Sequence, residues 1–137
     1  MGHKILLIED DVFVSDIYSR ELKKSGYEAE VAANGLEGVE MAKEGKYDLI
    51  LLDIMLPKKT GIDVLKEIRV PTSPAKDTPV YLLTNLGQGS IIKQAVEIGA
   101  QGYLLKARVL PSQVLHAVND FFENGPMKID LSEFGLE

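Results

Sequence analysis

The chain has 137 residues, of which 45% are hydrophobic and 26% charged, and its formal net charge is −6. This size and composition are typical of one globular domain, and no apolar run approaches the ~20 residues that span a bilayer. Cysteine is absent, which excludes disulfides and thiolate metal sites. The acidic balance disfavours a nucleic-acid partner, because phosphate backbones are bound by clustered Lys and Arg. We therefore expect a cytoplasmic protein without a membrane anchor or a secretory leader.

The first half of the chain begins with an alternation of strand and helix patterns. The apolar run Lys4–Ile8 predicts a buried strand, and apolar residues at spacings of three and four then predict a helix that ends near Gly26. The apolar stripe of this helix consists of Val14, Ile17, Tyr18 and Leu22. A second strand at 28–33 follows, and Asn34 is the expected N-cap of a second helix.

The same alternation continues to the end of the chain. The predicted segments are a strand at 47–53, a helix at 61–70, a proline-rich loop at 70–79, a strand at 80–84, a helix at 89–99, a strand at 102–105 and a last helix with Val114, Leu115, Val118, Phe121 and Phe122 on one face. Five apolar strands alternating with five helices predict a parallel sheet that is covered on both faces. In such a sheet the ligand site lies beyond the carboxyl ends of the strands.

Polar residues stand at the ends of four of the predicted strands. They are Glu9, Asp10 and Asp11 after the first, Asp53 at the end of the third, Thr84 at the end of the fourth and Lys106 after the fifth. Because parallel strands end at one edge of a sheet, we expect these side chains to converge. Three or four carboxylates in one place repel one another unless a cation such as Mg²⁺ lies among them. This set suits phosphoryl transfer, in which an Asp carboxylate can be the nucleophile.

Four motifs, in this order, resemble the receiver domain of two-component response regulators: ILLIEDD, DLILLDIMLP, VYLLT and GAQGYLLK. The resemblance covers the chain from about Lys4 to Asn124. It implies an α/β, flavodoxin-like (βα)₅ fold, with a doubly wound five-stranded parallel sheet in the strand order 2-1-3-4-5. It also implies a receiver domain at residues 1–124, followed by a short C-terminal tail at 125–137 and no output domain.

The resemblance assigns the phosphoryl chemistry to the acidic residues. Asp53 would be the phosphoacceptor, taking a phosphoryl group from the phosphohistidine of a sensor histidine kinase or phosphotransfer protein. Glu9, Asp10 and Asp53, with the backbone carbonyl of Met55, would hold Mg²⁺ or Mn²⁺. The chain would then be a signalling phosphoacceptor that catalyses only its own phosphorylation and dephosphorylation.

The resemblance also implies how the phosphoryl group is sensed. Thr84 and Lys106 would contact it, and Tyr103 would be an aromatic that turns inward as the Thr84 hydroxyl moves. The readout surface would be formed by the fourth helix, fifth strand and fifth helix. This surface would bind a downstream protein or a second copy of the chain.

Several residues near these positions depart from the family pattern, and Asp11, Asn85 and Leu86 are candidate modulators. Asn85 replaces a small residue, so it narrows the phosphoryl path or donates a hydrogen bond of its own. Ala107 replaces a proline that follows a cis bond, and a cis bond before another residue costs ~2.5–4 kcal/mol. Met55 and Leu86 are apolar, and in the family these two positions flank the path of the attacking water. We hypothesise that they exclude that water and give the phosphorylated state a long lifetime.

Other interpretations of these residues stay open. The acids at positions 9–11 could cap the first helix, where the helix dipole favours them, and Tyr103 could be a rigid packing residue. A pseudo-receiver that signals without phosphate is a second function, which Asn85 and Ala107 favour. A small hydrolase with Asp53 as nucleophile is a third, but no insertion encloses a substrate.

The C-terminal tail is more apolar than a typical linker. Its apolar residues include Ile129, Leu131, Phe134 and Leu136. We expect it either to dock on its own domain or on a second copy, or to be a frayed terminus.

Overall fold

The computed structural model describes residues 2–84, 89–105 and 110–129, and it contains the ten predicted elements. They are β1 (Lys4–Ile8), α1 (Val12–Lys24), β2 (Glu28–Ala32), α2 (Gly35–Ala42), β3 (Leu49–Asp53), α3 (Gly61–Ile68), β4 (Val80–Thr84), α4 (Gly89–Ile98), β5 (Gly102–Leu105) and α5 (Pro111–Asn124). All strand pairs are parallel, and the strand order is β2-β1-β3-β4-β5. The predicted doubly wound fold is confirmed. Within the described ranges, no helix is long and apolar enough to cross a membrane.

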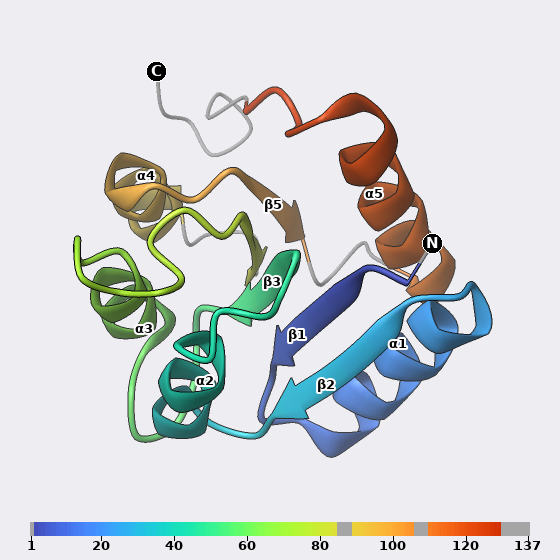
Figure 1. Cartoon of the computed structure of the whole chain (residues 1–137), viewed down its shortest axis with the longest axis horizontal. Coiled ribbons are helices and arrows are strands. Elements are labelled where there is room, and N and C mark those ends of the chain that lie inside the picture. The colour runs from blue at the N-terminus through green and yellow to red at the C-terminus, as the bar shows by residue number, and fades with distance from the viewer. Residues whose placement is uncertain (1, 85–88, 106–109, 130–137) are drawn as a thin grey trace.

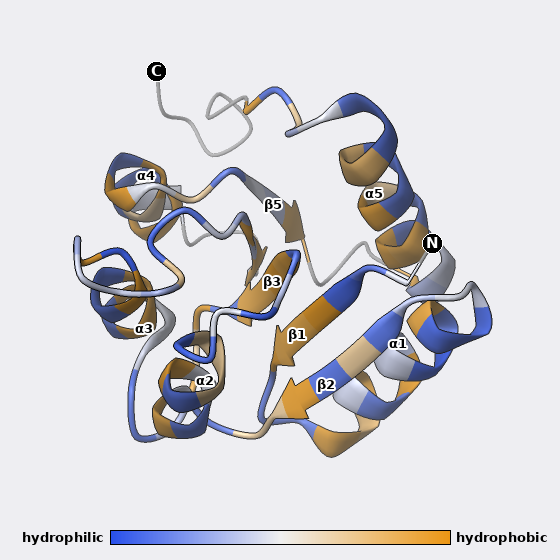
Figure 2. Ribbon diagram, viewed as in Figure 1, coloured by the Kyte–Doolittle hydropathy of each residue, from blue (hydrophilic) through white to orange (hydrophobic). Residues whose placement is uncertain are grey.

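Two apolar layers enclose the sheet, with α2, α3 and α4 on one face and α1 and α5 on the other (Figure 1). Alternate residues of each central strand enter opposite layers: in β1, Leu6 and Ile8 face the first and Ile5 and Leu7 face the second. Strands β1 and β3 are therefore mostly apolar, whereas the outer strand β2 also carries Glu28 and Glu30, and the helices carry apolar and polar stripes (Figure 2). Since both faces are buried, the sheet leaves its carboxyl edge as the place for a polar site.

Short polar side chains begin three of the helices, as helix capping requires. Asp11 caps α1, Asn34 caps α2 and Thr60 caps α3, each by accepting backbone N–H groups of the first turn. Gly26 follows α1 with a φ of +95°, so the predicted glycine at this helix end is confirmed.

The buried face of α1 differs from the predicted stripe. Tyr18 and Leu22 are buried as expected, but Ile17 is exposed, and Ser15 and Ser19 are buried in its place. Each serine hydroxyl donates to the carbonyl three residues earlier, at 3.2 and 3.1 Å, so burial leaves it hydrogen-bonded. Small serines pack between helix and core without an apolar signature, which is why the apolar pattern misplaced this face.

Arg69 joins three segments at the end of α3. Its guanidinium donates to the Ala75 and Gly99 carbonyls at 3.0 and 3.1 Å, and to the Gln101 side-chain oxygen at 3.1 Å. Burial lowers the pKa of this group from its ordinary value, but the partners keep the charge hydrogen-bonded. Arg69 thereby fixes the proline-rich loop and the end of α4 against α3.

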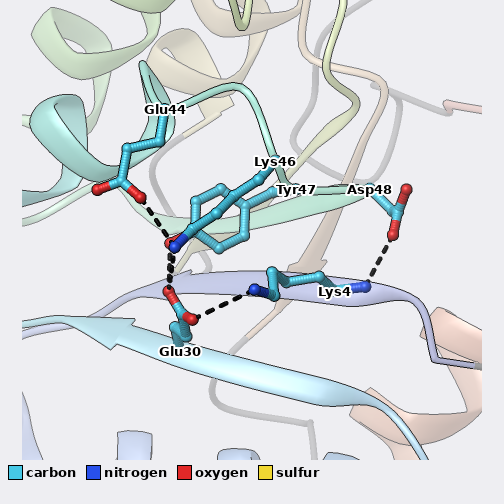
Figure 3. A network of polar contacts seen from close by, with 6 residues as sticks. All are labelled: Lys4, Glu30, Glu44, Lys46, Tyr47 and Asp48. Atoms are coloured by element: carbon cyan, nitrogen blue, oxygen red, sulfur yellow. Dashed lines mark hydrogen bonds and ion pairs between the residues drawn. The ribbon is translucent and has the colours of Figure 1, made fainter.

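A polar network ties the strands together at the amino edge of the sheet, away from the strand ends that carry the acids (Figure 3). The Glu30 carboxylate accepts the Tyr47 hydroxyl at 2.5 Å and forms ion pairs with Lys4 at 3.6 Å and Lys46 at 3.5 Å. The Tyr47 hydroxyl bond is the main cause that lowers the pKa of Glu30, with the two lysines adding to it.

The described part of the C-terminal tail docks on its own domain. Met127 and Ile129 pack against the core. Of the three alternatives for the tail, docking on its own domain therefore holds for these residues. Leu131, Phe134 and Leu136 lie outside the described residues.

Candidate functional site

Three carboxylates meet at the carboxyl edge of the sheet. Oxygens of Glu9, Asp10 and Asp53 lie within 4.8 Å of one another. β1 and β3 are paired with Ile8 opposite Leu52, so the next residue of each strand brings Glu9 beside Asp53. Glu9 is 1% and Asp53 3% exposed, whereas Asp10 faces solvent. The convergence predicted from the strand ends is confirmed for these three acids.

A cluster of this kind fits a hard divalent cation. Three carboxylates this close raise the free energy of one another's charged forms, and two of them are removed from water. Mg²⁺ and Mn²⁺ prefer carboxylate oxygens as ligands, and the exposed Asp10 leaves the cluster accessible to an ion from solvent. The donor set therefore suits the cation that the sequence predicted.

The loop after β3 holds Asp53 in place. The Met55 N–H donates to Asp53 Oδ1 at 3.1 Å, and the Gly61 N–H donates to the Ile54 carbonyl at 2.8 Å. A Cβ at Gly61 would lie 2.6 Å from Ile54 Cα and 2.7 Å from the Asp53 carbonyl oxygen. Only glycine allows α3 to begin this close to the end of β3, so Gly61 is a site residue that the sequence analysis missed.

Asp11 is separate from the cluster. Its Oδ1 accepts the N–H groups of Phe13 and Val14 at 2.9 and 3.2 Å, which makes it the N-cap of α1. Its own N–H donates to Glu9 Oε2 at 3.2 Å. The capping interpretation is thus correct for Asp11, and its carboxylate is not one of the three that converge. A modulating role for Asp11 would act through the Glu9 carboxylate.

Thr84 and Tyr103 lie on the two strands beside β3. Thr84 ends β4 one residue after Leu83, which pairs with Asp53, and it is buried at the same edge. Tyr103 is 4% exposed, belongs to the apolar layer under α2, α3 and α4, and pairs with Leu82. The structure thus brings Thr84 to the edge of the acidic cluster, whereas the Tyr103 backbone lies two register positions back along the strands.

Four residues of the predicted site fall outside the described ranges. Lys106 directly follows β5, Asn85 and Leu86 follow β4, and Ala107 carries the expected departure from a proline. Their predicted roles therefore stay predictions.

An exposed apolar rim borders the cluster, and the sequence analysis identified only Met55 among its residues. Val12 and Phe13 open α1 directly after the acids, and Met55 follows Asp53; Phe13 is 83% exposed. The signal was the pair of large apolar residues in the first turn of a helix, ahead of the stripe that faces the core. Such a rim is typical of a contact surface for another protein.

Comparison with known protein families gives one match over most of the chain. The model of the family described as "Response regulator receiver domain" matches residues 5–119. The chemotaxis protein CheY of Thermotoga maritima is 35% identical over 120 residues, which cover 87% of this chain and 97% of that protein.

Longer regulators match as well. The transcriptional regulatory protein CusR of Escherichia coli K12 is 35% identical over 131 residues, which cover 96% of this chain and 56% of CusR. The probable transcriptional regulatory protein SilR of Salmonella typhimurium is 41% identical over 103 residues, which cover 75% of this chain and 44% of that protein. The chain thus spans about half the length of these transcriptional regulators.

Solved structures agree with the observed fold. The chemotaxis response regulator CheY4 of Vibrio cholerae superposes with a TM-score of 0.79 at 28% identity, covering 87% of this chain and 98% of that one. The receiver domain of the sensor histidine kinase PA1611 from Pseudomonas aeruginosa gives a TM-score of 0.78 at 25% identity and covers 90% of this chain and 100% of that one. That structure has a magnesium ion coordinated in its active-site cleft.

Proposed function

Because the chain belongs to the response regulator receiver family, we propose that Asp53 accepts a phosphoryl group from the phosphohistidine of a sensor histidine kinase or phosphotransfer protein. The observation that carries this proposal is the geometry of Asp53. It ends β3 within 4.8 Å of two further carboxylates and is held by the Met55 N–H. A buried acid so placed is a nucleophile with fixed orientation, which removes much of the entropic cost of the reaction.

The transfer itself replaces one bond to phosphorus by another. An Asp53 carboxylate oxygen forms a bond to phosphorus while the bond from phosphorus to the histidine nitrogen breaks, and that nitrogen keeps the electron pair and takes up a proton. Glu9 and Asp10, with Asp53 and the Met55 carbonyl, would hold Mg²⁺ or Mn²⁺. When bound, the cation supplies charge neutralisation for the phosphoryl oxygens.

We assign the neighbouring residues to sensing the phosphoryl group. Thr84 would donate its hydroxyl to a phosphoryl oxygen, and Lys106 would pair with the same group. The Tyr103 ring would turn inward as the Thr84 hydroxyl moves, because the adjacent strands β4 and β5 carry the two residues. The readout surface would comprise α4, β5 and α5, which a downstream protein or a second copy would bind.

The apolar rim suits the phosphodonor partner. Val12, Phe13 and Met55 lie beside the acidic cluster, so a helix carrying the phosphohistidine can bury them while its imidazole reaches Asp53. We propose protein partners in the cytoplasm for this chain. Several relatives are named as transcriptional regulators, and DNA contacts of such proteins would be made outside the half that this chain spans.

The lifetime of the phosphorylated state is proposed to be long. The Met55 side chain is exposed and apolar beside Asp53. In the receiver family the position of Leu86 also flanks the path of attacking water, and two apolar residues there would leave that water without a hydrogen-bonding partner. Replacing both residues with Asn should speed the loss of phosphate from the protein, as followed by intact mass over time. Unchanged kinetics in the double variant would contradict this role.

The proposal is tested by intact-protein mass after incubation with acetyl phosphate, with and without Mg²⁺. We expect the mass of one phosphoryl group to appear in the native chain only with Mg²⁺, and to be absent from Asp53→Asn. The matched control is Asp63→Asn, which alters an exposed acid in the first turn of α3 and should be phosphorylated like the native chain. A folded native chain that gains no mass would favour the pseudo-receiver.

A further inference from the structure

The chain after α5 turns back toward the start of β5 (Figure 1). α5 ends at Asn124, and Gly125 follows with a φ of +87°, a conformation that favours glycine. The Gly125 N–H donates to the Phe121 carbonyl at 2.9 Å, which completes the helix end. The residues that follow therefore leave the helix in a fixed direction. We call the segment of residues 125–129 the strap.

Met127 attaches the strap to the sheet through several contacts. Its N–H donates to the Tyr81 hydroxyl oxygen at 2.8 Å, and its sulfur accepts the Tyr103 N–H at 3.4 Å. A Cβ at Gly102 would lie 2.7 Å from Met127 Cγ, so glycine is needed for the methionine to lie this close to β5. The side chain also packs against both apolar layers. The strap is thus held by directional bonds as well as by apolar burial.

β5 is where the strap and the proposed site meet. It is the last strand of the sheet, so its outer edge has no strand neighbour among the described residues, and such an edge leaves N–H groups to be satisfied in another way. The Met127 sulfur satisfies the N–H of Tyr103. Two residues further along, Leu105 pairs with Thr84. One four-residue strand is therefore held by the strap at its start and borders the site at its end.

We propose that Met127 is a positioning residue: the docked strap fixes β5 and Tyr103 against β4, and so preorganises the edge of the site at Thr84. The inference rests on the proposed function, since it requires Asp53 and Thr84 to bind a phosphoryl group. A strand that is already fixed need not be ordered when the group binds, so the docked strap strengthens binding. By thermodynamic reciprocity, an occupied site must hold the strap more tightly.

The test measures the affinity of the full chain for beryllofluoride, an analogue of a phosphoryl group on Asp, in the presence of Mg²⁺. Met127→Ala should weaken binding about fivefold, the lower end of typical coupling between sites. The matched control is Met41→Ala, which shortens another half-buried methionine against the same core, on α2. It should bind within about twofold of the native chain, since α2 packs mainly on α3, β1 and β2 and Met41 is not part of the strap.

A second measurement needs no variant and stays decisive where Met127→Ala fails to fold. In the native chain, hydrogen exchange of the Met127 and Tyr103 amides should slow when beryllofluoride binds. Equal affinities of the two alanine variants, or unchanged exchange of these amides in the loaded native chain, would overturn the inference and leave the phosphoacceptor proposal intact. A native chain that binds no beryllofluoride would refute the proposed function and, with it, the role of the strap.

Discussion

Replacing Gly61 by alanine should have two effects: it should destabilise the protein, and it should displace Asp53. The added Cβ would meet Ile54 Cα at 2.6 Å and the Asp53 carbonyl oxygen at 2.7 Å. Ordinary carbon contacts lie at about 3.5–4.0 Å, so the backbone of the β3–α3 loop must move by about 1 Å. Overpacking typically costs about 1–3 kcal/mol, and we expect the upper end, about 3 kcal/mol, because backbone atoms cannot change rotamer.

Gly38→Ala is the matched control for this prediction. Its Cβ would also lie under 3.0 Å from another atom, but the atoms that it meets are the side-chain carbons of Ile8, at 2.8 and 2.9 Å. A side chain can rotate away, and alanine gains about 1 kcal/mol over glycine inside a helix. We therefore expect Gly38→Ala to change the free energy of unfolding by no more than about 1 kcal/mol.

Urea unfolding of the two variants measures these free energies, and acetyl phosphate labelling measures the effect on the site. Gly61→Ala should be labelled more slowly than Gly38→Ala, because the moved loop carries Asp53 and the Met55 N–H. Equal losses of stability in the two variants would refute the distinction between backbone and side-chain contacts. Native labelling kinetics in a destabilised Gly61→Ala would show that the loop does not position Asp53.

Three further predictions concern the cation, the polar network and the buried arginine. Mg²⁺ at 100 times its dissociation constant should raise the free energy of unfolding by about 2.7 kcal/mol. Asp10→Asn should remove most of this gain. The control Asp16→Asn, on the exposed side of α1, should keep it. The pKa of Glu30 is lowered in the folded state, so its carboxylate stabilises the fold above the ordinary pKa of 4.5, and this stabilisation is lost as the pH falls through the lowered pKa. Tyr47→Phe removes the main cause of the lowered pKa. Urea titrations at several pH values should therefore show a smaller loss of stability on acidification in this variant. Arg69→Met removes three hydrogen bonds of a charged donor and should cost about 3 kcal/mol in the same assay. A loss under about 1 kcal/mol would mean that water replaces the guanidinium.

The sequence was sufficient for the sheet and for the acidic cluster. Apolar runs of strand length specify buried parallel strands, and parallel strands end at one edge, so Glu9 and Asp53 had to meet although 44 positions separate them. The helix signals at Gly26 and Asn34 were read correctly because capping depends on local chemistry alone.

Other features depend on packing that no local pattern records. Ser15 and Ser19 carry no apolar signature, so the buried face of α1 was misplaced. The need for Gly61 arises from the approach of α3 to the end of β3, which is known only once both are placed. The apolar tail was recognised, but the attachment of Met127 to Tyr103 joins segments 24 positions apart and follows from the chain reversal at Gly125.

Locating the phosphoryl group on the labelled protein shows whether Asp53 is the phosphoacceptor. Borohydride reduces an aspartyl phosphate to homoserine, so the protein would be labelled with acetyl phosphate and Mg²⁺, reduced, digested and mapped by mass spectrometry. Phosphorylation of Asp53 predicts homoserine at Asp53 and at no other acid. Homoserine at Asp10, or a labelled protein in which Asp53 is unmodified, would contradict it.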